Sequence, residues 1–259
     1  HVVWLRENQF GEMMSPGSGM EPAGEPGDST FISRERVRKD TFYKKKIRYG
    51  ARDYYFVALP EQSSVSSDFF CRDLYPEGEF SVTVSLRGYY ETDNKNLRFE
   101  IENSKGTNQI GTGTLMGEEV RFFYFSSLPS EWLSEGENTL VISSQSAPYP
   151  VLINHFTVEY DRMMNIRSGM LEFSFDTPRD SIQVTGFDSP AGYLADITGE
   201  SGHQIYTLTP EMFSQSGSEY TLSVKVPSGF SGRFALFEQG GGRHIYNRWI
   251  TPDQDSDIK

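Results

Sequence analysis

Histidine, cysteine and acidic side chains are the residues that could support catalysis or metal binding in this chain. Its one cysteine, Cys71, follows two phenylalanines, and such an apolar setting weakens a thiol as a nucleophile. A catalytic thiolate also needs an imidazole partner, and no local motif joins Cys71 to His1, His155, His203 or His244. We therefore interpret Cys71 as a buried structural residue and predict no catalytic residue in this segment.

The histidines are scattered too widely along the chain to predict a metal site. Asp253, Asp255 and Asp257 stand at alternate positions, as carboxylates do in the first half of a calcium-binding loop, but Ile258 occupies the position of the turn glycine. The glycine-rich segments lack the Gly-Lys-Ser/Thr motif of a phosphate-binding loop. The sequence thus predicts neither a metal ion nor an organic cofactor.

Exposed aromatic rings can stack on sugars, and several aromatic residues are candidates for such contacts. Tyr54-Tyr55 and Tyr89-Tyr90 are adjacent pairs, and neighbours in a strand point to opposite faces, so one ring of each pair could be exposed. The candidate carbohydrate-binding residues are Tyr54, Tyr89, Tyr90 and Trp132. A place in the core or at its rim is the alternative for each of them.

A second candidate contact region is a basic stretch in an otherwise acidic chain. The net charge of −12 opposes binding to nucleic acid, which depends on neutralising phosphates. Between Arg34 and Arg52, however, nine Lys or Arg stand against two acidic residues, a local net charge of +7. This stretch is either a solvated arm that complements the acidic body or a docking site for an acidic partner. The candidate partner contacts in this stretch are Arg34, Arg36, Lys44, Lys45 and Lys46. Trp249, near the other end of the chain, is a further candidate, either as a packing anchor or as a partner contact.

The alternation of apolar and polar residues predicts β-strands. A two-residue period runs from Phe80 to Leu86 and recurs over 97–101, 156–160, 171–175 and 220–226. Turn residues are expected to separate these runs at the short spacing of an all-β sandwich or barrel, among them Gly88, Gly106 and Gly111 to Gly113. Long amphipathic helices do not alternate with the predicted strands, so a parallel α/β sheet is not expected. The pattern favours a β-sandwich.

Four segments between Phe80 and Arg162 read VTVSLRGYY, NLRFEIENS, LPSEWLSEGENTLVISS and INHFTVEYDR. The third contains a Leu-x-x-Gly-x-Asn turn, formed by Leu133, Gly136 and Asn138. This set resembles the galactose-binding-like jelly roll, in which such a turn opens the strand before the closing one. The resemblance implies a jelly-roll topology for the sandwich.

The order of short motifs along most of the chain gives a second resemblance. VWL precedes DYYFVAL, the jelly roll ends at Tyr160 and Arg162, and GMLEFSF, VTGFDSP and ADIT follow. This succession is similar to the non-catalytic β-rich region upstream of the catalytic domain in gingipain-type, caspase-like cysteine peptidases of secreted bacterial proteins, many of which use type IX secretion. In that family the catalytic His and Cys belong to a separate α/β domain, and nothing in this sequence matches them.

The expected fold is therefore all-β, a jelly-roll β-sandwich followed by a second, smaller β-domain. We expect an N-terminal strand, a Pro/Gly loop and the basic arm over 1–52, the sandwich over 53–165, the small domain over 166–239 and a linker or C-terminal tail over 240–259. The sequence begins at His1 rather than Met, so we treat it as a piece of a longer precursor.

The resemblance implies a non-catalytic accessory module, secreted or at the cell surface, that packs against or assists a peptidase domain in its own or a separate chain. A carbohydrate-binding module of galactose-binding-like type is the alternative, with a glycan as the partner. An enzyme on a β-scaffold is a third hypothesis, for which the sequence offers no site. We expect no nucleic-acid partner, and no membrane span because no apolar run approaches the length of about 20 residues that a span needs.

Overall fold

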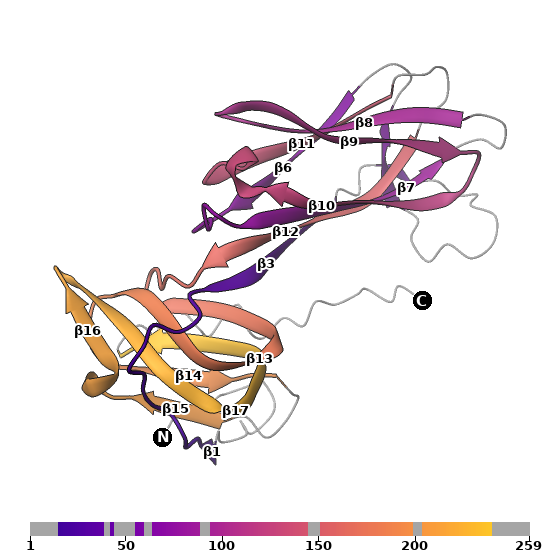
Figure 1. Ribbon diagram of the computed structural model, residues 1–259. Helices are drawn as coiled ribbons and strands as arrows, with labels where there is room; N and C mark the ends of the chain where they lie inside the picture. Colours follow the sequence, from indigo (N-terminus) through magenta and orange to yellow (C-terminus); the bar gives the residue numbers. More distant parts are fainter. Residues whose placement is uncertain are drawn as a thin grey trace. The chain divides into compact units, whose positions relative to one another are not determined.

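The computed structural model describes residues 15–38, 42–43, 55–59, 64–88, 94–144, 151–198 and 204–239. These residues are nearly all in strands, with two single-turn 3-10 helices, η1 (Ser130–Trp132) and η2 (Pro210–Met212). They divide into two compact units, which lie within Ile32–Arg162 and within His1–Phe31 plus Met163–Lys259. The all-β prediction is confirmed (Figure 1).

The unit within Ile32–Arg162 is a sandwich of two antiparallel sheets. The first sheet has the order β10-β7-β12-β5-β4, with β3 also paired to β12, and the second has the order β6-β11-β8-β9. The strands are β3 (Thr30–Val37), β4 (Phe42–Tyr43), β5 (Tyr55–Leu59), β6 (Ser64–Cys71), β7 (Glu79–Gly88), β8 (Asn94–Asn103), β9 (Gly106–Met116), β10 (Val120–Pro129), β11 (Gly136–Ser144) and β12 (Val151–Met163). Chain neighbours from β5 to β8 alternate between the two sheets, and β9 to β12 return in the same way. Eight strands in this order form a jelly roll, as the resemblance implied.

The other unit is built on one strongly bent sheet with the order β1-β15-β14-β17-β13, to which β2 and β16 add by pairing with β17. Its strands are β1 (Ser15–Pro16), β2 (Glu21–Pro22), β13 (Met170–Phe187), β14 (Gly192–Asp196), β15 (Gln204–Leu208), β16 (Phe213–Ser216) and β17 (Glu219–Glu238). Register shifts interrupt the pairing of β13 with β17, including one between Phe175 and Arg179. Such irregularities bend long strands, and they allow one sheet to curl around its own apolar core.

Part of the segment expected as a single N-terminal arm belongs to this second unit. Phe31 lies in its core, with its ring centroid 6.1 Å from that of Phe173. The backbone N–H of Met164 donates to the carbonyl of Ser29 at 2.7 Å. The remainder of β3, from Ile32 onwards, belongs to the sandwich.

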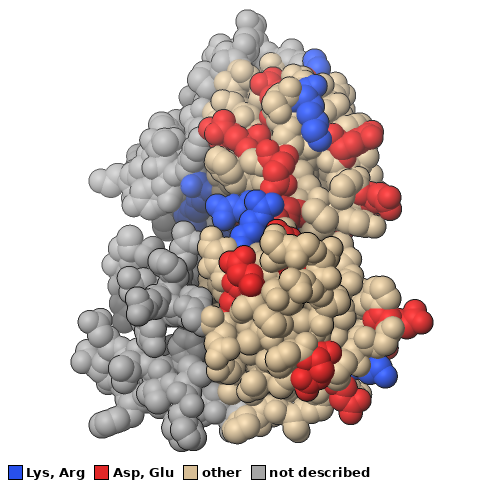
Figure 2. Space-filling model, turned by 90° about the vertical axis from the view of Figure 1, so that its left-hand side faces the viewer, with Lys and Arg blue, Asp and Glu red and all other residues tan. Residues whose placement is uncertain are grey.

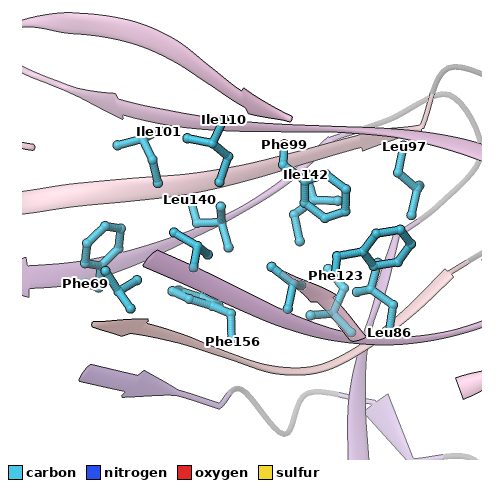
Figure 3. Close-up of a cluster of buried hydrophobic side chains, with 14 of the residues drawn as sticks. Phe69, Leu86, Leu97, Phe99, Ile101, Ile110, Phe123, Leu140, Ile142 and Phe156 are labelled. Carbon is cyan, nitrogen blue, oxygen red and sulfur yellow. The ribbon is translucent and has the colours of Figure 1, made fainter. Parts of the chain in front are cut away.

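Strand alternation gives the sandwich a continuous apolar layer between its sheets. Figure 3 shows Leu86, Phe123 and Phe156 of the first sheet pointing toward Phe99 and Ile142 of the second. Burying a side chain of this size stabilises the fold by roughly 1.5–3 kcal/mol. The layer therefore fixes which face of each strand points inward.

In the part of the chain that the structure describes, no helix is long and apolar enough to cross a membrane.

Two glycines that we expected in a turn lie instead inside strand β9. A Cβ atom on Gly111 would stand 2.2 Å from the ring of Phe125, and one on Gly113 would stand 2.1 Å from the ring of Phe123. The turn prediction for these residues is wrong, because here glycine makes room for aromatic rings of the facing sheet.

The Leu-x-x-Gly-x-Asn segment forms a tightly bonded turn before β11. The side chain of Asn138 is fully buried and accepts from the N–H of Ser134 and from Nδ2 of Asn103, both at 2.8 Å. Its own Nδ2 donates to the carbonyls of Ser134 and Gly136. One side chain thus satisfies polar groups of β8, of the turn and of the first residue of β11, with Leu133 anchored in the core.

Replacing Asn138 tests how much the sandwich depends on this turn. We expect Asn138→Ala to lower the free energy of unfolding by about 2–4 kcal/mol, because it leaves buried N–H and C=O groups without partners. Urea denaturation of Asn138→Ala measures the loss. The neighbouring exposed residue provides a control, since Glu137→Ala should change stability by less than about 0.5 kcal/mol. Equal effects of the two substitutions would contradict this role of Asn138.

Candidate functional site

The candidate site is the side of the first sheet that points away from the core. Because Val84, Phe123 and Phe156 point inward, their strand neighbours point to the other side. This outer face consists of Arg34 and Arg36 on β3, Ser81, Thr83, Ser85 and Arg87 on β7, Val120, Phe122 and Tyr124 on β10, and His155, Thr157 and Glu159 on β12.

Strand register arranges the outer face into rows that cross the strands. Phe122 and His155 stand opposite Ser85 from its two sides, and Tyr124 and Thr157 stand likewise opposite Thr83. The rings of Phe122 and His155 approach edge to face, with centroids 6.5 Å apart. They cover Ser85, which is only 1% exposed although it lies on the solvent side of the sheet.

Three large apolar side chains of β10 remain open to solvent on this face. Val120 is 55% exposed, Phe122 61% and Tyr124 64%. Single exposed apolar residues are common on proteins, but a contiguous group on one strand typically marks a contact with a protein or another ligand. The geometry therefore points to binding at this strand.

The other end of the outer face carries charge. Nε of Arg34 donates to Oε1 of Glu159 at 2.6 Å, and the hydroxyl of Ser81 donates to Oε2 of Glu159 at 3.4 Å. Arg34 is 67% exposed, so solvent screens this ion pair and it adds little stability. Arg36 follows on the same side of β3 and is also exposed. Figure 2 shows Lys and Arg side chains lying beside Asp and Glu side chains on the face that it draws.

The structure brings together two of the predicted contact residues. Arg34 and Arg36 lie on the outer face, across β12 and β7 from the exposed aromatic rings. Trp132 lies in η1, packs partly buried against the sandwich core, and its carbonyl accepts from Nδ2 of Asn103 at 2.8 Å. The remaining candidates lie outside the described residues, namely Tyr54, Tyr89, Tyr90, Lys44, Lys45, Lys46 and Trp249.

Phe122 and Tyr124 were missed as candidates from the sequence. They belong to the segment VRFFYF, in which aromatic residues occupy both strand faces and no polar alternation marks the outer one. The distinguishing signal is the neighbouring strand, where Ser81, Thr83 and Ser85 mark the outer side of β7. Only the pairing of β10 with β7 connects the two patterns.

A separate polar cluster lies at one end of the sandwich. Nη2 of Arg162 contacts Oδ2 of buried Asp73 at 3.0 Å, and Glu135 accepts from the N–H groups of Asp73 and Leu74. The hydroxyl of Tyr160 accepts from the N–H of Arg72 at 3.0 Å. These bonds satisfy the turn after β6, so we assign the cluster a structural role. Among the described residues, no group of three or more His, Cys, Asp or Glu could hold a metal ion.

Cys71 borders this cluster and is fully buried, as the sequence predicted. Burial, together with the negative charges of Glu35 and Glu135, raises the pKa of the Cys71 thiol to about 12. Burial also raises the pKa of Glu35, although Arg72 and Arg162 partly oppose this. The thiol is therefore protonated at neutral pH and is a poor nucleophile.

No protein-family model and no curated protein matches this chain. Among solved structures, it is similar to dimeric latent PorU from Porphyromonas gingivalis, with 12% identity, a TM-score of 0.61 and coverage of 88% of this chain and 22% of the PorU chain. The C-terminal family 22 carbohydrate-binding module of Clostridium thermocellum Xyn10B has 9% identity and a TM-score of 0.33. The match covers 54% of this chain and 96% of the module's chain. The tandem family 22 modules of Paenibacillus barcinonensis Xyn10C have 10% identity and a TM-score of 0.34, and the match covers 85% of each chain.

The fold defines this chain as an all-β module with a jelly-roll sandwich and a second β-unit. More particularly, its fold is similar to that of a part of PorU, and the chain spans 22% of the PorU chain. At this level of identity the likeness concerns the fold.

The buried thiol gives a prediction about reactivity and alkaline stability. Native Cys71 should not react with a thiol-specific reagent at pH 8, whereas the protein in urea should react fully. The pKa of about 12 exceeds the value of roughly 8.5 for an unfolded thiol, so the unfolded state loses its proton first as pH rises. Stability should therefore fall between about pH 9 and pH 12.

Cys71→Ala supplies the control, because it removes this titration. Its free energy of unfolding should decline less steeply above about pH 9 than that of the wild type. Rapid labelling of native Cys71, or identical pH profiles for the two proteins, would show that the thiol is not held in this protonated state.

Proposed function

We propose that this chain is a non-catalytic interaction module of a larger secreted bacterial protein, and that it packs against or assists a gingipain-type cysteine peptidase domain. The order of its sequence motifs supports this proposal, as does the similarity of its fold to a part of latent PorU. The match covers most of this chain but a minor share of PorU, which agrees with a module inside a longer protein.

The exposed outer face of the first sheet is the observation that carries the proposal. Val120, Phe122 and Tyr124 form an apolar strip at one side, and Arg34 and Arg36 stand at the other. Aromatic residues and arginine are enriched at protein interfaces, and they supply much of the binding energy there. The sheet beneath holds these side chains in fixed positions, so binding needs little ordering of the backbone.

Removing the two rings tests docking at the outer face. The peptidase domain encoded by the same precursor, expressed separately, should co-purify with the wild-type module. The double variant Phe122→Ser with Tyr124→Ser should weaken binding about tenfold to a thousandfold, because two buried aromatic contacts are lost. Calorimetric titration measures the change in affinity.

Met116→Ser is the matched control, since Met116 is 54% exposed but lies on β9 of the second sheet. It should bind as the wild type does. Absence of binding and no change in the folding yield of the peptidase domain would contradict the proposal, and so would a precursor gene that encodes no peptidase domain.

A glycan is the second candidate partner, favoured by the spacing of the exposed rings. Phe122 and Tyr124 are two residues apart on one strand face, which separates their Cα atoms by roughly 6.8 Å. Thr83 and Thr157 lie in the same row as Tyr124, on the next two strands of the sheet, and carry hydroxyl groups. Aromatic faces with a few fixed polar groups are typical of small-molecule sites.

Affinity electrophoresis against a panel of plant and bacterial polysaccharides tests the glycan hypothesis. Retardation of the wild-type protein by one polysaccharide, together with its loss in Tyr124→Ala and its retention in Met116→Ala, would support a sugar site on the outer face. Unchanged mobility across the whole panel would exclude it and leave the protein partner.

A further inference from the structure

Strand β10 forms an edge of the first sheet. Residues Val120 to Phe125 pair in unbroken register with Arg87 to Val82 of β7, and no other described strand pairs with the opposite side of β10. The register shifts between Phe125 and Leu128, where Ser127 has a positive φ of 52°. The regular free edge is therefore limited to Val120–Phe125.

The composition of β10 is unusual for a strand that pairs with a described strand on one side only. Five of the six residues in VRFFYF are apolar or aromatic, Arg121 is the only charge, and the segment contains no Pro or Gly. Every strand edge presents unpaired N–H and C=O groups, which proteins usually protect with charges, proline or bulges. Within Val120–Phe125 the single charge of Arg121 is the whole of that protection, so this regular aromatic segment is prone to pair with another strand.

We propose that a second copy of this chain covers the edge, by antiparallel pairing of β10 with β10 about a two-fold axis at Phe122. The first sheet then continues from one molecule into the other. This inference is independent of the proposed function, because the pairing uses the backbone edge of β10 whereas a docked partner would use the outer face.

The alternation of strand faces restricts the register. Residues opposite each other in an antiparallel pair point to the same face, so a continuous sheet pairs outer-face residues of one copy with outer-face residues of the other. A two-fold axis must therefore pass through a residue. Within the regular segment, an axis at Tyr124 would already place Phe122 opposite Ser126, in the irregular part of β10. The axes that remain are at Arg121, Phe122 and Phe123.

Charge and backbone geometry distinguish these three registers. An axis at Arg121 places Arg121 opposite its own copy, and like charges directly opposite each other are destabilising. An axis at Phe123 places Val120 opposite Ser126, inside the irregular part of β10. An axis at Phe122 avoids both problems. Its outermost pair joins Phe125 to Glu119, whose carbonyl still accepts from the N–H of Gly88 on β7 at 3.2 Å, so all residues from Glu119 to Phe125 stay in regular pairing.

The register centred on Phe122 is also complementary in its side chains. On the outer face it brings Val120 beside Tyr124 of the second copy and Phe122 beside its own copy, and aromatic cross-strand pairs of this kind are favourable. On the inner side Arg121 faces Phe123 of the second copy. Arg121 lies over its own Phe123 ring, with its guanidinium carbon 5.3 Å from the ring centroid, and its Nη1 donates to the carbonyl of Thr114 at 2.6 Å, so its charge is held on the inner side of the edge.

Sedimentation velocity of the 259-residue chain tests self-association. We expect a monomer–dimer equilibrium at roughly micromolar to hundred-micromolar concentration, because a single strand contact buries less area than stable dimers do. Each copy carries a net charge of −12, so the dimer should tighten as salt rises from about 50 to about 500 mM. A monomer at all concentrations, or open-ended aggregates, would overturn the inference.

The substitution Phe122→Lys places two positive charges at the axis and should weaken dimerisation at least about tenfold, that is about 1.4 kcal/mol or more. Phe122 is exposed in the monomer, so the fold should survive, and circular dichroism checks this. Met116→Lys adds the same charge on β9 and should dimerise as the wild type does. Equal dimerisation of the two variants would exclude pairing through β10.

Cysteine cross-linking tests the register independently of affinity, and buried Cys71 does not compete. Phe122→Cys should form a disulfide-linked dimer under mild oxidation. Val120→Cys alone should not, because its copies stand four residues apart along the strand, roughly 14 Å, beyond the reach of a disulfide. A mixture of Val120→Cys and Tyr124→Cys should cross-link. Cross-linking of Val120→Cys to itself would refute this register.

Discussion

The packing of two sheets around one apolar layer is the constraint on which the sandwich depends. Leu86, Phe99 and Phe156 meet between the sheets, and strand alternation then leaves no freedom in the direction of their neighbours. A shift of β10 by one residue would exchange Phe123 and Phe125 for Phe122 and Tyr124 in the core. That exchange would bring the Tyr124 hydroxyl into the apolar layer and would remove the rings that fill the space beside Gly111 and Gly113. The outer face is therefore a consequence of the core: Phe122 and Tyr124 point to solvent because Phe123 and Phe125 must not.

The same constraint explains the positions of Gly111 and Gly113. The rings of Phe123 and Phe125 extend far enough across the layer to occupy the space of a Cβ atom on β9. The large rings on β10 and the glycines on β9 therefore fit each other across the core layer. Phe99 completes it, with its ring centroid 5.1 Å from that of Phe123 and 4.9 Å from that of Phe125.

Strands with a polar side could be predicted from the sequence, and strands without one could not be oriented. The alternation from Phe80 to Leu86 identifies β7 and its inner face correctly, because solvent on one side selects polar residues there. VRFFYF carries no such record, since both of its faces are aromatic. A segment with Gly111 and Gly113 so close together looks like a turn in the sequence. Their role becomes visible only beside the facing strand β10, whose pairing a local sequence pattern does not reveal. The outer face is missed for the same reason, because it is assembled from β3, β7, β10 and β12.

The exposed rings and the free edge occur on one strand, and this has a physical consequence for binding. Edge pairing about Phe122 would place the apolar strip of each copy beside that of the other, because opposite residues share a face. The outer face would then extend across the axis, with twice the apolar area and with an arginine-bearing β3 on each side. Any partner that contacts both copies would bind more tightly than one copy allows, since the second contact is intramolecular. Either contact can form without the other, but where both form, the geometry of β10 would make each one strengthen the other.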